Sequence, residues 1–204
     1  MIEDDRNSQF SAVVLPHLPD ALTTALWLTG DRADAEDVVQ EACLRAFRAI
    51  ATFTGGNARA WVLAIVRNTA YSWLQKNRRV ELVPVDDLEP DERAQAERGA
   101  DIEELTLVTP EADVIARADE AHLRVEIEKL PAEFRETLVL RDIQGLEYRE
   151  IAEITSVPVG TVMSRLARAR RRLVMALSQE SGDHGRSRVR TLPVRSLKYA
   201  RPAS

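Results

Sequence analysis

The chain has 204 residues, of which 45% are hydrophobic and 30% are charged, and its formal net charge at pH 7 is −5. This balance is typical of a folded globular protein and excludes a wholly disordered chain. Aromatic residues make up only 5%, with 8 Gly and 9 Pro, so the composition favours helices over sheets. No run approaches the roughly 18 apolar residues of a membrane span, and the acidic N-terminus lacks the apolar core of a secretory signal. We therefore expect a cytoplasmic protein without membrane insertion.

The charges are distributed in blocks, and these blocks divide the chain. Residues 31–41 are acidic, residues 57–79 are basic without a single acid, and the residues from 159 onward are basic again. The block between them, 80–118, is acidic, contains three prolines and lacks helical periodicity, which predicts a flexible linker. The sequence thus predicts an all-α fold with two small helical domains at 1–79 and 119–178, joined by an acidic linker at 80–118 and followed by a basic, disordered tail at 179–204.

A first amphipathic helix is predicted from Asp34 to Ile50. Apolar residues recur every three or four positions on one of its faces, and acidic residues dominate the opposite face. Taken alone, the acidic face reads as an ordinary solvated surface. The single cysteine, Cys43, lies beside the apolar face, so we expect a buried structural role for its thiol. One cysteine allows no internal disulfide, which agrees with a reducing compartment.

A second helix is predicted over residues 58–75, after a Gly-Gly-Asn break. Its apolar arc is wide, so the helix should be buried on most sides. Trp61 and Trp73 are candidate stacking platforms for bases, but their positions on the helix favour packing in the core. A narrow strip that combines a cation, amides and an aromatic ring suits single-stranded nucleic acid. The strip comprises Arg67, Asn68, Tyr71 and Gln75.

The C-terminal part has the pattern of a helix-turn-helix. A helix is predicted over residues 130–144, a short helix over 147–155 and a long helix over about 160–177. Ala152 is small where the last two helices cross. Four residues later, Ser156 stands where most such motifs carry glycine, and a left-handed backbone is less comfortable for serine.

The last predicted helix separates into an apolar stripe and a basic stripe. It carries five arginines and no acid, a crowding that is unfavourable without an anionic partner. Arginine binds guanine edges and phosphates, so we interpret the basic stripe as a DNA-reading surface. Arg170 and Arg171 point elsewhere and are expected to meet phosphates or solvent. The basic stripe comprises Thr161, Ser164, Arg165, Arg168 and Arg172.

Four segments resemble the extracytoplasmic-function (ECF) family of RNA polymerase sigma factors, group 4 of the sigma-70 superfamily. Residues 34–41 (DAEDVVQE) and 60–70 (AWVLAIVRNTA) resemble the polymerase-binding helix of the family's first conserved domain and the helix that follows it. Residues 148–154 (YREIAEI) and 158–166 (PVGTVMSRL) resemble the family's second domain. The segments occur in the family's order, on either side of the acidic linker.

The resemblance implies a protein that binds core RNA polymerase, reads the minus-35 and minus-10 elements of promoter DNA and helps to open the duplex. It implies no cofactor, no metal and no small-molecule substrate, and it makes an anti-sigma factor an expected partner. The acidic linker would pass through the polymerase's nucleic-acid channel. The implied polymerase contacts are Asp34, Glu36, Asp37, Gln40 and Glu41. The implied minus-10 contacts are Phe53, Asn57, Arg59, Arg67, Asn68, Tyr71 and Ser72. The implied minus-35 contacts are the residues of the basic stripe, with Ser164, Arg165 and Arg168 nearest the base edges.

Two other readings of the sequence stay open. A sigma-like decoy that binds an anti-sigma factor would share the fold, although it need not keep the basic stripe. A conventional helix-turn-helix regulator would form a dimer and read a palindromic site. An enzyme is not expected, because the three histidines lie in unrelated contexts and no nucleophile–base set or phosphate loop appears. Met163 stands where family members often carry Arg or Lys, and the basic tail lies outside the family's common pattern.

Overall fold

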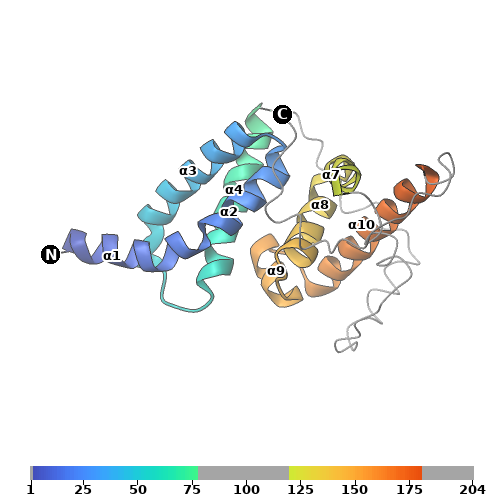
Figure 1. The fold of residues 1–204 in the computed structure, drawn as a ribbon. Helices are drawn as coiled ribbons and strands as arrows, with labels where there is room; N and C mark the ends of the chain where they lie inside the picture. Colours follow the sequence, from blue (N-terminus) through green and yellow to red (C-terminus); the bar gives the residue numbers. More distant parts are fainter. Residues whose placement is uncertain (1, 78–119, 181–204) are drawn as a thin grey trace. The chain divides into compact units, whose positions relative to one another are not determined.

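The computed structural model describes residues 2–77 and 120–180, which contain helices and no strand (Figure 1). The all-α prediction is therefore confirmed. The predicted linker at 80–118 and all but the first two residues of the predicted tail lie outside the described residues. The elements, in chain order, are α1 (Ile2–Val14), η1 (Leu15–His17), α2 (Leu18–Thr29), α3 (Arg32–Ala49), η2 (Ile50–Thr52), α4 (Ala58–Asn77), α7 (Glu120–Lys129), α8 (Ala132–Leu138), η4 (Val139–Ile143), α9 (Tyr148–Thr155) and α10 (Val159–Glu180).

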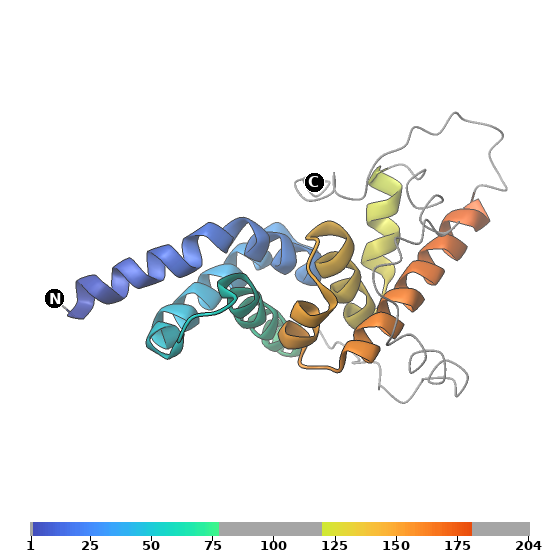
Figure 2. The ribbon, with the colours of Figure 1, turned by 90° about the horizontal axis from the view of Figure 1, so that it is seen from below.

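The chain forms two compact units, of which the first contains α1 to α4. Helices α2, α3 and α4 each pack against the other two, and they lie side by side in both ribbon views (Figures 1 and 2). None of the helices in the described ranges combines the length and the hydropathy needed to cross a bilayer.

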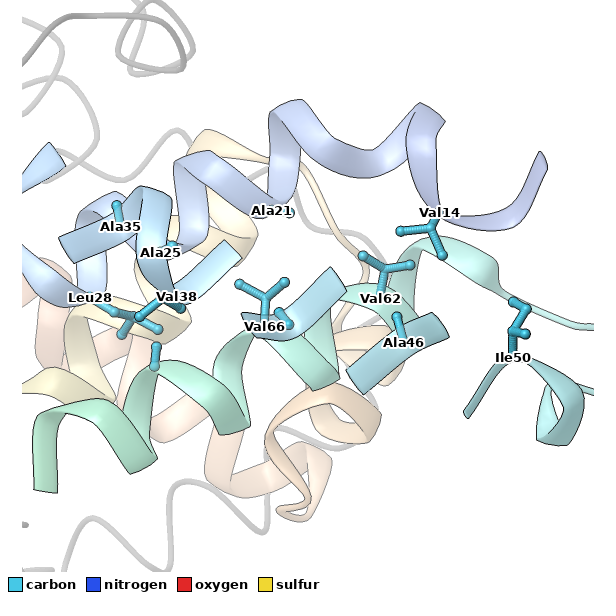
Figure 3. Packing of buried hydrophobic residues seen from close by; sticks show 12 residues of the cluster. Val14, Ala21, Ala25, Leu28, Ala35, Val38, Ala46, Ile50, Val62 and Val66 are labelled. Atoms are coloured by element: carbon cyan, nitrogen blue, oxygen red, sulfur yellow. The ribbon is translucent and has the colours of Figure 1, made fainter. Parts of the chain in front are cut away.

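Small side chains allow the three helices of the first unit to approach closely. Ala21 and Ala25 of α2 and Ala35 of α3 are completely buried, and close contact between helix backbones requires such short side chains. Larger residues fill the space around them, and Figure 3 shows aliphatic side chains of different helices, among them Val38 and Val62, gathered along one interior. The predicted apolar face of α3 is therefore its core-facing side.

The turn between α2 and α3 is built from two residues with opposite roles. Gly30 ends α2 with φ of 74°, a left-handed conformation that glycine adopts without steric cost. Asp31 then begins α3 as its N-cap, because its side chain accepts a hydrogen bond from the Asp34 N–H at 3.0 Å. This cap places the start of α3 two residues before the predicted start.

No element was predicted before Asp34, and α1 and α2 are therefore findings of the structure. Helix α1 is held by contacts with the end of α3. Phe10 meets Phe47 edge-on, with ring centroids 5.4 Å apart. The Arg6 guanidinium lies over the same Phe47 ring and donates to the carbonyls of Phe47 and Arg48, at 2.8 and 3.2 Å. An arginine at the C-terminal end of a helix satisfies carbonyls that have no partner within the helix.

The second unit contains α7, α8, η4 and α10, and its core confirms the predicted apolar stripe of the last helix. Val162, Leu166, Ala169, Leu173 and Leu177 are each at most 5% exposed. Helix α10 packs against α7 and α8, and Figure 2 shows it as one continuous helix. Helix α7 was not predicted.

The helix predicted over residues 130–144 is divided into α8 and a π-helical turn, η4. The wider turn is closed by the Gln144 N–H, which donates to the Val139 carbonyl at 2.9 Å. Gly145 follows with φ of 71°, so the predicted stop at Gln144-Gly145 is confirmed. Arg141 organises the next loop, because it donates to the Leu146 carbonyl at 2.8 Å and lies 4.6 Å from the centroid of the Tyr148 ring.

Ser156 has the left-handed backbone that the helix-turn-helix pattern predicts for this position, with φ of 56°. A left-handed conformation costs a residue with a Cβ roughly 1–2 kcal/mol, whereas glycine adopts it freely. We expect Ser156→Gly to raise the free energy of unfolding of the protein by about 0.5 kcal/mol, because the greater freedom of glycine in the unfolded chain offsets part of the gain. Thermal unfolding followed by circular dichroism would measure the change. Ser156→Ala keeps the Cβ and should give no gain, so equal midpoints for the two variants would contradict the explanation.

Candidate nucleic-acid interface

The acidic face of α3 is presented to solvent by the packing of its apolar face. Glu36, Asp37 and Gln40 are exposed, and Asp34 and Glu41 are half-buried. These five residues, the predicted polymerase contacts, are called the acidic face below.

Two salt bridges within α3 hold carboxylates of the acidic face. Arg32 binds Glu36 and Arg45 binds Glu41, each with an Nε–Oε1 distance of 2.8 Å and the arginine four residues from its partner. The hydrogen bond from Arg45, helped by the positive charges of Arg45 and Arg48, lowers the pKa of Glu41 below its usual value. Glu41 therefore stays negatively charged at neutral pH.

Leu44 extends the acidic face with an apolar side chain whose exposure helical periodicity did not reveal. It lies one helical turn beyond Gln40 and is 49% exposed. A single exposed leucine is common on protein surfaces, and its position beside the carboxylates makes Leu44 a candidate apolar contact for a partner of this face. The neighbouring Cys43 was expected to be buried and is half-buried. This partial burial raises the pKa of its thiol, so the thiol stays protonated at neutral pH.

The polar strip of α4 is organised by contacts among its own members and with the neighbouring Ser72. The Arg67 guanidinium lies 4.6 Å from the centroid of the Tyr71 ring, and its Nη1 donates to Asn68 Oδ1 at 3.2 Å. Ser72 donates to the Asn68 carbonyl at 2.8 Å. Asn68 and Ser72 are exposed, and Arg67 and Tyr71 are half-buried. The structure thus brings a cation, an amide, a ring and a hydroxyl together on one face of one helix.

The loop before α4 is fixed at both ends. Phe53 packs against Trp61 with ring centroids 5.1 Å apart, and Asn57 caps α4 by accepting a hydrogen bond from the Ala60 N–H at 3.0 Å. Arg59 binds Asp20 of α2 through an Nε–Oδ2 contact of 2.7 Å. Each of these three predicted minus-10 residues therefore has a structural contact that the sequence did not reveal.

The exposed tip of this loop consists of Gly55 and Gly56, whose φ values are 100° and 98°. Residues with side chains rarely adopt such values, so the loop shape depends on the two glycines. The two tryptophans of α4, Trp61 and Trp73, pack partly buried against the core of the first unit, as their positions on the helix predicted.

The basic stripe of α10 divides by burial. Thr161, Ser164 and Arg168 are half-buried and Arg172 is exposed, whereas Arg165 is 7% exposed. Ser164 donates to the Thr161 carbonyl at 3.0 Å.

Two arginines of the stripe contact the first turn of α8. The Arg165 Nη2 lies 3.2 Å from Oε2 of Glu133, and the side chains of this ion pair are 9% and 20% exposed. The Arg172 guanidinium lies 4.9 Å from the centroid of the Phe134 ring. Arg165 was expected to lie nearest the base edges, but in this structure its guanidinium is buried against the Glu133 carboxylate.

Arg170, which was expected to meet phosphates or solvent, binds Asp142 of η4, and its side chain stays 34% exposed. Its Nη2 and Nε lie 2.6 and 3.1 Å from the two carboxylate oxygens, a bidentate arrangement that fixes both side chains. Sequence periodicity did not identify Asp142 or Glu133, because both acids lie on other elements and become partners only when the helices pack.

Helical units with a helix-turn-helix and an exposed acidic helix face are typical of one class of protein, the helical transcription proteins. Comparison with known families identifies the family within this class. Residues 13–80 match Sigma-70 region 2, and residues 122–173 match Sigma-70 region 4. The chain belongs to the extracytoplasmic-function (ECF) family of RNA polymerase sigma factors.

Individual relatives agree with this assignment. The chain is 32% identical over 169 residues to RNA polymerase sigma-H factor from Pseudomonas aeruginosa. This match covers 82% of this chain and 86% of the relative. It is 38% identical over 138 residues to ECF RNA polymerase sigma-E factor from Escherichia coli, covering 67% of this chain and 70% of the relative. Among solved structures, it is similar to the sigma factor RpoE in complex with the anti-sigma factor NepR from Bartonella quintana, with a TM-score of 0.59, 28% identity and coverage of 83% and 96% of the two chains.

Proposed function

We propose that the chain binds core RNA polymerase, directs it to promoters by reading minus-35 and minus-10 elements, and helps to open the DNA. The observation that carries the proposal is the pairing, in one chain, of an exposed acidic helix face in a region 2 unit with an arginine-rich helix in a region 4 unit. The protein acts by binding, without catalysing a reaction of its own, and it works in the cytoplasm, where its polymerase and promoters are. The domains proposed for these roles are 1–79 and 119–178, joined by the linker 80–118 and followed by the tail 179–204.

The acidic face of α3 is the proposed polymerase contact. Exposed carboxylates attract a basic partner over distance and raise the rate of association, whereas apolar contacts at the centre of an interface supply most of its affinity. Asp37 and Gln40 offer the polar groups, and Leu44 offers the apolar one.

The strip on α4 and the loop before it are the proposed minus-10 contacts. Opening a duplex exposes bases and leaves phosphates on a single strand, so a surface that holds it needs stacking, hydrogen-bonding and positive groups together. Asn68 supplies an exposed amide, and Arg67 supplies a charge held over Tyr71. The structural contacts of Phe53, Asn57 and Arg59 suit a supporting role in the same site, since they fix the loop beside the strip.

Helix α10 is the proposed reader of the minus-35 element. Arg168 and Ser164 are the proposed base contacts, Thr161 lies near the start of the same helix, and the exposed Arg172 is placed for a phosphate. An anti-sigma factor is a further proposed partner, which the similarity to a sigma factor solved with its anti-sigma factor supports.

Permanganate footprinting tests DNA opening directly, because permanganate oxidises thymines only where they are unpaired. With core polymerase, this chain and a cognate promoter, we expect reactive thymines in the minus-10 element and none when any component is omitted. Specific binding without reactive thymines would favour a conventional regulator, and absence of any polymerase complex would favour the decoy.

A further inference from the structure

We propose that Arg165 is a positioning residue for promoter reading rather than a DNA contact, and that Glu133 is its required partner. The inference rests on the proposed function of α10 as the minus-35 reader, and it changes the role expected of Arg165 from the sequence. It is carried by the ion pair between Arg165 Nη2 and Glu133 Oε2, 3.2 Å apart.

Burial separates Arg165 from the other members of the basic stripe. Its side chain is 9% exposed, so its guanidinium would have to leave Glu133 to reach a base or a phosphate. If it left, the Glu133 carboxylate, which is only 20% exposed, would lose its partner. The free-energy cost of a buried charge without a partner is far larger than the net stabilisation from the intact pair. The native pair therefore keeps the guanidinium within the protein.

The contacts around the pair indicate what it positions. Arg165 and Arg172 are seven residues apart and share one face of α10, where they meet the adjacent residues Glu133 and Phe134 in the first turn of α8. A third contact, between Arg170 and Asp142, ties α10 to η4. These three contacts, together with the buried apolar stripe, fix the rotation of α10 about its own axis.

That rotation decides where the proposed base contacts point. Ser164 adjoins Arg165, and Arg168 lies one turn further along the same helix. A rotation of α10 by a few tens of degrees would move both groups away from bases that hydrogen bonds read over a few ångströms.

Replacing the pair with apolar side chains of similar length distinguishes positioning from DNA contact. Under the positioning role, Arg165→Met and Glu133→Met each leave one charge without its partner, and each should lower transcription from a cognate promoter by roughly tenfold. The double variant removes both charges and should recover to within about threefold of the wild-type chain. Its salt dependence of promoter binding should keep the wild-type slope, since no phosphate contact is lost.

If Arg165 contacts DNA, Glu133→Met should leave promoter binding unchanged or tighter, the double variant should be as defective as Arg165→Met, and the slope should fall by about one. Circular dichroism melting of each variant shows that it is folded at the assay temperature, and a folded double variant without recovery overturns the proposal. As a matched control, Glu133→Met should not rescue Arg168→Met. Failure of the wild-type chain to initiate transcription would refute the proposed function, whereas failure of the double variant alone would refute only this inference.

Discussion

Replacing Asp37 with arginine is expected to abolish stable binding of the chain to core RNA polymerase. Asp37 is exposed on α3, beside Gln40 and Glu41. The substitution changes the local charge by two units and places a cation opposite the basic surface that the acidic face is proposed to meet. Like charges brought together at an interface cost several kcal/mol, so the affinity should fall by at least about a hundredfold. Fluorescence anisotropy with labelled chain and purified core polymerase measures this affinity.

The fold should survive the Asp37 substitution, because Asp37 lies outside the core and outside the N-cap of α3. Glu128→Arg, an equal charge reversal at an exposed position of α7, is the matched control and should keep the wild-type affinity. If the folded Asp37→Arg variant binds polymerase with unchanged affinity, the acidic face is not the polymerase contact.

The second large effect is expected from Arg168→Ala, which should weaken promoter use by about 1–3 kcal/mol, or roughly 5–150-fold. Arg168 lies on α10 one turn after Ser164 and keeps part of its side chain exposed. An arginine that binds a base edge contributes both affinity and discrimination, because its two donors match guanine and no other base in the major groove. The loss should therefore be largest on cognate promoters and smallest on promoters already altered at the contacted position.

Transcription from a set of minus-35 variants, each carrying one base change, measures this discrimination. Arg171→Ala is the comparison within the same helix and should leave the order of preference among the promoters unchanged. An equal loss on every promoter for Arg168→Ala, with a salt slope lowered by about one, would make Arg168 a phosphate contact instead.

The fold was predictable where helical periodicity was strong. Helices α3, α4, α9 and α10 follow the spacing of their apolar residues, with ends displaced by a few positions. The left-handed turn at Ser156 was predictable because a helix-turn-helix demands that backbone whatever residue occupies it. Helix α1 was missed because contacts of Arg6 and Phe10 with the distant end of α3 hold it. Helices α2 and α7 were missed as well.

The candidate site was predictable as two charged surfaces but not as a set of individual roles. A helical wheel places Arg165 and Arg168 on one stripe, and only the packing of α8 separates a buried guanidinium from a half-exposed one. Arg170 was assigned to phosphate or solvent because its partner Asp142 lies 28 positions earlier in the chain. Partners that meet only in the folded protein leave no periodic signal in the sequence.

Run-off transcription is the most direct test of whether the chain acts as a sigma factor. Purified core polymerase is incubated with a library of promoter fragments, with and without this chain, and the transcripts are sequenced to locate their start sites. We expect the chain to confer initiation at fragments sharing a two-part element, one part near position −35 and the other near −10. Start sites that are the same with and without the chain would contradict this expectation.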